Sequence, residues 1–230
     1  MEAQAPNDHH GISQATSPVA LVLVGGDRAD GRLRARLPEL AAVIAADSGL
    51  AQARVLGVAP TVVIGDMDSV DPTMLEEAAS AGAEIERHPA DKDATDIELA
   101  LDRALQMECR SVIVVGGYGG RVDHLLGNAL VLTAERFSTI DVEWWVAGTR
   151  IRVARQEVPV HIEGTAGDTV SLLAAAGDAH GVTTTGLRWS LENETLEAGS
   201  TRGISNELMG TAASVRVRRG VLLVVHGGRE

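Results

Sequence analysis

The sequence predicts an α/β protein in which a mostly parallel sheet, with helices on both faces, is followed by a smaller all-β sandwich. Three observations support this fold class. The first half alternates short β-branched runs with stretches of helical spacing, as in a parallel sheet with crossover helices. The helical spacing fades after about Gly148. Short strand-like runs then follow one another, separated by frequent glycines, which is typical of a sandwich or barrel.

The strands expected in the first half are nearly continuous apolar runs, as strands buried on both faces should be. They cover Val19–Val24, Val43–Ala46, Thr61–Ile64, Ser111–Val115 and Val142–Val146, with a weaker one at Ala83–Arg87. The helices expected between them cover Leu50–Leu56, Pro72–Ala81, Ile97–Leu105 and Leu125–Ala134. The later strands cover Ile151–Ala154, Val158–Ile162, Thr169–Leu173, Val215–Val217 and Val221–Val225. We therefore expect a disordered tail at residues 1–17, an α/β domain at 18–148 and a β-sandwich domain at 149–230.

The composition excludes several classes of protein. The 230 residues are enough to bury a hydrophobic core without disulfides or structural metals. No apolar run approaches the roughly 18 residues of a membrane helix. The single cysteine, Cys109, excludes an intramolecular disulfide and fits a reducing cytoplasm. A net charge of −12 argues against nucleic acid or an anionic membrane as partner. An anionic small ligand would need a metal cation between it and the protein.

Polar segments stand at several strand ends and helix starts, where an open parallel sheet binds its ligands. The first holds Asp47 and Ser48, directly after the second strand. Either side chain could simply cap the next helix. This segment alone therefore leaves a structural and a functional interpretation open.

The second segment carries two carboxylates, Asp66 and Asp68, which point the same way if the chain there is extended. Side by side they repel each other unless a cation lies between them, and Mg²⁺ prefers such oxygen ligands. A plain turn is the alternative interpretation. Asp71 has a structural role instead, because Asp71-Pro72 is a good N-cap for the following helix.

The third segment, residues 91–98, opens the third helix. Asp93 as N-cap and Asp96 three residues later fit a capping box, which explains both without a function. A helix N-terminus also attracts phosphate, and acidic residues there would repel it unless Mg²⁺ bridges them. On that interpretation Asp93 and Asp96 bind the metal. Lys92, the only lysine in the chain, is then a partner for phosphate or else a solvated surface residue.

The fourth segment is a glycine-rich loop directly after a strand. Gly119 and Gly120 let backbone N–H groups approach a ligand, and Arg121 offers a planar fork that suits phosphate oxygens. No Gly-Lys-Ser/Thr follows, so the loop is not a Walker P-loop. Asp123 can cap the following helix. His124 is either a core or capping residue or a phosphate ligand.

All four segments can meet at one edge of the sheet. Together the four segments predict a Mg²⁺–nucleotide site in which carboxylates hold the metal, while Arg121 and backbone N–H groups hold phosphates. These segments resemble those of the thiamine pyrophosphokinase family. The matching stretches are Ala46–Gly49, Gly65–Ser69, Lys92–Asp96, Gly119–His124, Gly181–Leu191 and Gly203–Glu207. They occur in the family's order and at similar spacing, between about Val19 and Val225.

The resemblance implies a homodimer that transfers diphosphate from ATP to the hydroxyl of thiamine, giving AMP and thiamine diphosphate. It implies that ATP is bound by Asp47, Lys92, Asp93, Thr95, Gly119, Gly120, Arg121 and His124. The implied Mg²⁺ ligands are Asp66, Asp68, Asp93 and Asp96, and the implied catalytic residues are Asp66, Asp68, Asp96, Arg121 and Asp123. Thiamine would lie between the α/β domain of one chain and the β domain of the other, against Trp189, Ser205 and Asn206.

Simpler roles stand beside these. Trp189 could pack the sandwich core, Ser205-Asn206 could form a turn, and we expect Trp144-Trp145 to pack at the domain junction. Two other functions stay open: a diphosphokinase for another alcohol, such as a pterin, and a nucleotide- or thiamine-binding sensor without turnover. An NAD or sugar-nucleotide enzyme fits less well, because only Gly25-Gly26-Asp27 follows the first strand.

Overall fold

A computed structural model describes residues 17–89, 91 and 93–227 of the chain. The tail expected at 1–17 lies, except for its last residue, outside the described residues, and so does Lys92. The strands are β1 Val19–Val24, β2 Ala42–Ala46, β3 Val62–Gly65, β4 Glu84–Arg87, β5 Ser111–Val115, β6 Asp141–Val146, β7 Thr149–Arg155, β8 Val160–Glu163, β9 Thr169–Ala174, β10 Ala179–Thr185, β11 Glu194–Leu196, β12 Asn206–Glu207, β13 Ala212–Arg216 and β14 Val221–Gly227. The α-helices are α1 Leu50–Leu56, α2 Pro72–Ser80, α3 Asp96–Gln106 and α4 Val122–Leu132, and the 3₁₀ helices are η1 Gly31–Arg36, η2 Asp47–Gly49 and η3 Glu135–Phe137.

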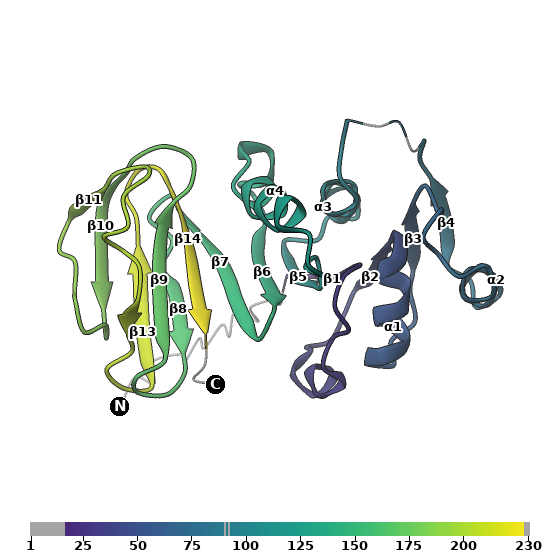
Figure 1. The fold of residues 1–230 in the computed structure, drawn as a ribbon, viewed down its shortest axis with the longest axis horizontal. Coiled ribbons are helices and arrows are strands. Elements are labelled where there is room, and N and C mark those ends of the chain that lie inside the picture. The colour runs from purple at the N-terminus through teal and green to yellow at the C-terminus, as the bar shows by residue number, and fades with distance from the viewer. Residues whose placement is uncertain (1–16, 90, 92, 228–230) are drawn as a thin grey trace, which may run out of the picture.

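One ten-stranded sheet runs through both halves of the molecule, in the order β12-β9-β14-β7-β6-β5-β1-β2-β3-β4 (Figure 1). The strands from β6 to β4 are parallel, and those from β7 to β12 are antiparallel. The direction changes at the β6–β7 hairpin, whose two turn residues, Ala147 and Gly148, both have positive φ. The position expected to separate two domains is therefore a tight turn that carries the sheet onward. The division into domains stays a prediction.

The smaller sheet, in the order β11-β10-β13-β8, is antiparallel. It packs on the antiparallel half of the large sheet, with Val182 and Val215 against Leu172 and Leu222 in one buried cluster. The expected all-β sandwich thus exists, but one of its two layers belongs to the large sheet. Burying such side chains stabilises the sandwich by roughly 1.5–3 kcal/mol each.

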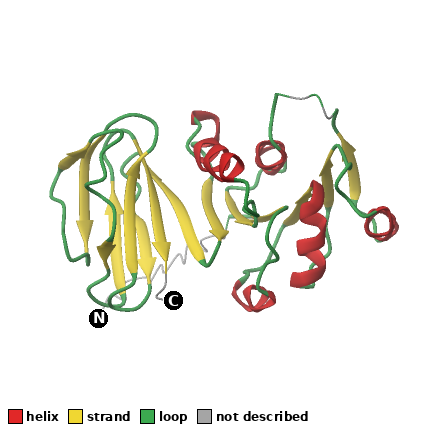
Figure 2. Cartoon of the chain, viewed as in Figure 1, coloured by secondary structure: helices red, strands yellow, loops and turns green. Residues whose placement is uncertain are grey.

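Helices cover both faces of the parallel half, as the alternating pattern predicted (Figure 2). Along β1, Val22 faces the core under α3 and α4, whereas the neighbouring Leu23 faces the core around α1 and α2. The layers hold the carboxyl ends of β1, β2, β3 and β5 at one edge. No helix in the described part of the chain is both long and apolar enough to cross a membrane.

Of the three capping residues predicted from the sequence, two do not cap their helices and one does. Helix α3 begins at Asp96 after Thr95, so Asp93 is not its N-cap. Helix α4 begins at Val122, which places Asp123 in the first turn and not at the cap. Asp71 does cap α2, because its side chain accepts the N–H of Thr73 at 2.8 Å.

Candidate active site

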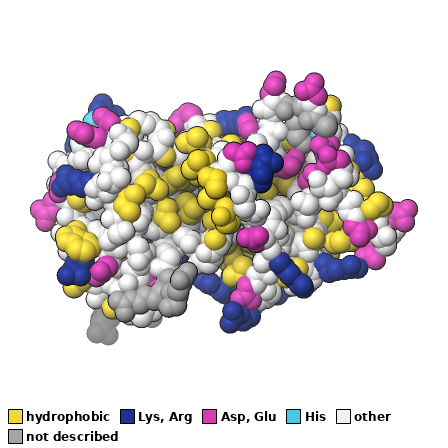
Figure 3. Space-filling view, viewed as in Figure 1, with side chains coloured by type: hydrophobic (Ala, Val, Ile, Leu, Met, Phe, Trp, Pro, Cys, Tyr) yellow, Lys and Arg dark blue, Asp and Glu magenta, His cyan; other side chains and the backbone are white. Residues whose placement is uncertain are grey.

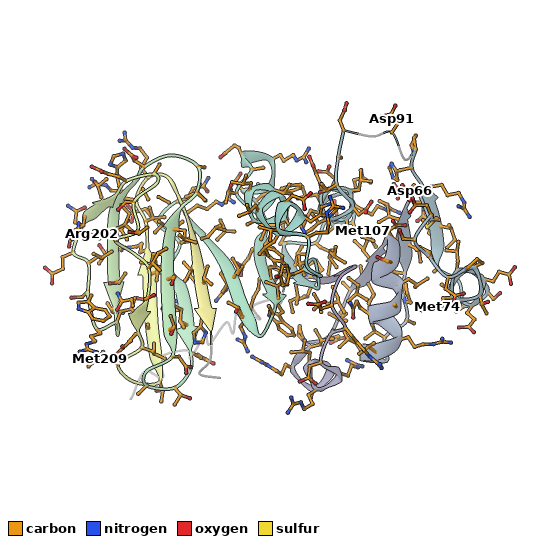
Figure 4. The ribbon with its side chains drawn as sticks, viewed as in Figure 1. Asp66, Met74, Asp91, Met107, Arg202 and Met209 are labelled. Atoms are coloured by element: carbon orange, nitrogen blue, oxygen red, sulfur yellow. The ribbon has the colours of Figure 1, made fainter. Side chains whose placement is uncertain are left out.

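Three carboxylates meet where β2 and β3 end. Asp47 directly follows β2, and Asp66 and Asp68 follow β3. One ligand oxygen from each residue lies within 4.8 Å of the others. Figure 4 labels Asp66 in the half of the molecule that holds β3 and β4. This acidic cluster joins two of the predicted segments.

The chain around Asp66 is a turn and not the extended segment that we expected. Met67 has a φ of 67°, and the N–H of Asp68 donates to Oδ1 of Asp66 at 3.1 Å. Oδ1 of Asp47 accepts the N–H of Met67 at 3.1 Å, which ties the turn to the end of β2. The two carboxylates still come together, but the turn and Asp47 bring them there, not strand alternation.

Asp47 is the buried member of the cluster, with 8% of its surface exposed. Burial raises the pKa of its carboxyl to about 6, and the charges of Asp96 and Asp66 add to this, against the hydrogen bond from Met67. A carboxyl in this position is more stable when a proton or a cation neutralises it. The site therefore fits a hard divalent cation such as Mg²⁺ on electrostatic grounds.

A cavity of about 310 Å³ opens beside the acidic cluster. Its lining includes residues from the acidic and helix-start segments (Asp47, Asp66, Thr95 and Asp96) and from the glycine loop and α4 (Gly117, Gly119, Arg121 and His124). All four predicted segments thus contribute to one cavity, as we expected from their positions at strand ends and helix starts.

Two glycine loops, after β1 and β5, also line this cavity. A Cβ on Gly26 would lie 2.2 Å from the carbonyl oxygen of Tyr118, and one on Gly119 would lie 2.9 Å from the Cα of Gly26. Only glycine permits this approach of the two backbones. The loops after β1 and β5 are therefore packed main chain to main chain.

Arg121 has an acidic partner in this structure. Its guanidinium donates to both carboxylate oxygens of Asp123, at 3.0 and 2.6 Å. The pairing lowers the pKa of Asp123 well below its ordinary range and raises that of Arg121. Both side chains are 66% exposed, so the pair contributes little to stability and leaves the guanidinium accessible.

The other predicted residues divide into those at the cavity and those away from it. His124 is exposed at the cavity rim, on the first turn of α4. Asp93 and Gly120 are also exposed, but among the described residues they belong neither to the acidic cluster nor to the cavity lining. Asp47, which we expected only to bind ATP, belongs to the acidic cluster.

The predicted thiamine residues lie together in the sandwich. Trp189 is 54% exposed, so it is not a core residue, and the guanidinium of Arg188 lies 4.8 Å from its ring centroid. Asn206 is buried and binds the main chain of Trp189 through both ends of its amide, at 3.1 and 2.7 Å. Asn206 thus holds Trp189 in place. Ser205 is exposed, with a φ of 61°.

Some residues at the cavity were not predicted from the sequence. Gly25 and Tyr118 line it, and buried Asn128 donates its side-chain N–H to the carbonyl oxygen of Gly117 at 3.2 Å. Asn128 carried one possible signal, because it lies four residues after His124 on the same face of α4.

Comparisons with known proteins point to one family. The chain matches the family model of the thiamin pyrophosphokinase catalytic domain over residues 34–144 and that of the thiamin pyrophosphokinase vitamin B1 binding domain over residues 148–222. A thiamine pyrophosphokinase of Bacillus subtilis is 29% identical over 191 residues, which cover 79% of this chain and 85% of that protein. Thiamine pyrophosphokinase 1 of rice is 33% identical over 64% of this chain and 58% of its own length.

Solved structures give the same result. The crystal structure of the thiamine pyrophosphokinase from B. subtilis has a TM-score of 0.80 and 26% identity, and the match covers 92% of this chain and all of that one. The structure from Geobacillus thermodenitrificans has a TM-score of 0.76 and 26% identity, covering 92% and 98%. The chain belongs to the thiamine pyrophosphokinase family.

Proposed function

We propose that the chain transfers diphosphate from ATP to the hydroxyl of thiamine and releases AMP. The family assignment makes it an ATP-dependent diphosphotransferase. The observation that carries the proposal is the acidic cluster beside the glycine loops, at the edge of the sheet where ligands bind. We also place the reaction in the cytoplasm, as expected from the single cysteine.

Each part of the cavity then has a task. Asp47, Asp66 and Asp68 would hold Mg²⁺, which when bound offsets the negative charge of the triphosphate. The side chain of Arg121 would move from Asp123 to a phosphate oxygen, since both residues are exposed and the exchange leaves no buried charge. The closely packed glycine loops would fix the position of the phosphates. Orientation of this kind can lower the reaction barrier by roughly 7–11 kcal/mol.

The test is the release of AMP from ATP and Mg²⁺, with and without thiamine. We expect AMP to form only when thiamine is present, in equal amount to thiamine diphosphate. Nucleotide binding without AMP would favour a sensor, and AMP formation with a pterin alcohol instead would favour the other acceptor. Asp71→Asn is the control variant, because Asp71 caps α2 outside the cavity and asparagine caps as well.

The proposal includes a homodimer whose active sites are shared between chains. Figure 4 labels Asp66 and Met209 at opposite ends of the molecule, and Met209 pairs with Gly186, close to Trp189. A thiamine on Trp189 of one chain therefore lies far from the acidic cluster of that chain. A second copy removes this difficulty by bringing its own acidic cluster to Trp189.

Exposed apolar side chains support this arrangement. Val122, Leu126 and Leu130 form a stripe at i, i+4 and i+8 on α4 and are 57–59% exposed. Figure 3 shows hydrophobic side chains exposed across the middle of one face. A stripe of this kind on the helix that carries His124 is typical of an interface next to a site.

Mixing two inactive variants tests the shared site. Asp68→Asn and Trp189→Ala carry their defects at different ends of the chain. After the two are unfolded and refolded together, half of the dimers are mixed, and one of the two sites in each is intact. We expect about a quarter of the wild-type activity at low thiamine. No recovery, with mixed dimers shown by mass, would place each site within one chain.

A further inference from the structure

A cavity of about 540 Å³ lies at the edge of the sheet opposite the acidic cluster, and the proposed reaction does not use it. The end of α4, the turn after β7 and the turn between β13 and β14 surround it. Three arginines line it: Arg155, Arg218 and Arg219. We propose that this arginine cavity binds a small anion that carries phosphate groups.

Strand pairing brings the three arginines together. Strand β7 starts beside the carboxyl end of β6 and runs antiparallel to it, so its last residue, Arg155, reaches the edge opposite the acidic cluster. There Arg155 pairs with Val221, the first residue of β14, directly after the turn that holds Arg218 and Arg219. The N–H groups of Arg218 and Arg219 both donate to the carbonyl oxygen of His180 at 3.1 Å. Hydrogen bonds to both sheets therefore hold the backbone that carries the arginines.

Arg155 is the buried member of the three, with 9% of its surface exposed. Its guanidinium donates to the carbonyl oxygens of Leu132 and Ala134 at 2.9 and 3.4 Å, at the C-terminal end of α4, where a positive charge is favourable. These two bonds leave other N–H groups of the planar fork unused. No hydrogen bond joins Nε to another described residue, and Nε is not among the nitrogen atoms that are both buried and unpaired. Nε is therefore open to the cavity.

The positive charge of the arginine cavity is not balanced from within the protein. In the described part of the chain none of the three arginines forms an ion pair. Glu135, which is exposed, is the one acidic residue among the described lining, so three positive charges and one negative charge give a formal net charge of +2. The nearby Glu157 is paired with Arg216 at 3.8 Å. A buried charge is normally compensated, and an anion in the cavity would compensate that of Arg155.

The form of the cavity favours a small phosphate anion over other anionic partners. The guanidinium fork matches the oxygen atoms of phosphate, and a doubly charged phosphate balances the net charge better than a single carboxylate does. Arg155 is buried, so a ligand must enter the cavity to reach it, which a flat acidic protein surface does not do. The volume lies within the range of ordinary ligand sites and leaves room for an organic group beside the phosphates.

Calorimetric titration with inorganic diphosphate, in EDTA and without ATP or thiamine, tests the proposal. EDTA removes any metal that would carry diphosphate to the acidic cluster. Arg219→Gln should weaken binding by the wild type about tenfold, because it removes a hydrogen bond to a charged group. Arg110→Gln is the matched control: Arg110 is also exposed and precedes β5 at the same edge, but it lies outside the lining. This control should change the Kd less than about twofold.

Arg155→Lys keeps the positive charge at the end of α4 but loses the fork, so it should also weaken diphosphate binding. Its melting temperature checks that the fold is intact, and Arg219→Gln tests the cavity through an exposed side chain. No binding by the wild type would refute the proposal. An equal loss in Arg110→Gln and Arg219→Gln would indicate general attraction by surface charge. A loss in Arg121→Gln but not in Arg219→Gln would place diphosphate at the glycine loops instead.

Titration with ADP distinguishes free diphosphate from an organic diphosphate as the ligand. ADP that binds more tightly than diphosphate, and is weakened equally by Arg219→Gln, would support an organic phosphate whose remaining part fills the cavity. Diphosphate that is weakened by Arg219→Gln, while ADP is not, would support an inorganic phosphate anion as the ligand.

Discussion

Replacing Asp47 with asparagine should make the metal-free protein more stable at neutral and alkaline pH. Asp47 lies in the left-handed region, at a φ of 50°, which asparagine tolerates better than most residues. The amide oxygen of asparagine can still accept the N–H of Met67. The substitution therefore removes one negative charge and leaves the local backbone almost unchanged.

The size of the effect follows from the pKa of Asp47, which is about 6 in the folded protein against an ordinary value of 3.8. Below pH 3.8 the carboxyl is protonated in both the folded and the unfolded chain. Between pH 3.8 and 6 the unfolded chain loses a proton that the folded protein keeps, so the free energy of unfolding falls as the pH rises. Above pH 6 the whole loss is present, at most about 3 kcal/mol.

Urea unfolding in EDTA, at several pH values from 4 to 8, measures this effect. We expect Asp47→Asn to be about 1–3 kcal/mol more stable than the wild type at pH 8 and equal to it near pH 4. Adding Mg²⁺ at pH 8 should reverse the order. A ligand at 100 times its Kd adds about 2.7 kcal/mol to a protein that binds it, and the variant has lost a ligand oxygen with full charge.

The matched control is Asp71→Asn, an exposed N-cap that asparagine can replace. Its stability should stay within about 0.5 kcal/mol of the wild type at every pH. A gain in Asp47→Asn that does not depend on pH would mean that the carboxyl is not the source of the effect. No gain at pH 8 would refute the account of Asp47 as an uncompensated buried charge.

Further substitutions test the other parts of the site. Asp68→Asn should lower turnover by roughly two to three powers of ten, about 2.7–4 kcal/mol, in steady-state assays, and unchanged turnover at limiting Mg²⁺ would remove it from the metal site. Trp189→Ala should raise the KM for thiamine far more than that for ATP, whereas equal rises would not fit a thiamine surface. Trp144→Phe loses a hydrogen bond of 2.7 Å from the buried indole N–H to the carbonyl oxygen of Gly116. This substitution should lower the free energy of unfolding, measured in urea, by about 1–3 kcal/mol. An unchanged free energy would mean that this hydrogen bond does not stabilise the fold.

The strands of the parallel half could be predicted because their signal is local. Runs such as Ser111–Val115 are β-branched and buried on both faces, so composition alone marks them. Strands β10 and β11 carry no such signal. They are rich in threonine and half exposed, and β10 contains Gly181, so their sequence does not differ from that of a loop. The sequence also did not predict that one sheet runs through both halves, because Ala147-Gly148 fits a linker and a hairpin turn equally well.

The candidate site was predictable in its members but not in its geometry. Carboxylates at strand ends follow from the sequence, and the parallel sheet brings them to one edge. The place of Asp47 among them depends on a left-handed backbone at that residue and on its bond to Met67, which no sequence pattern indicated. For Asp93 the sequence predicted a role that the structure does not show. Its spacing fitted a cap, but the helix begins three residues later, at Asp96.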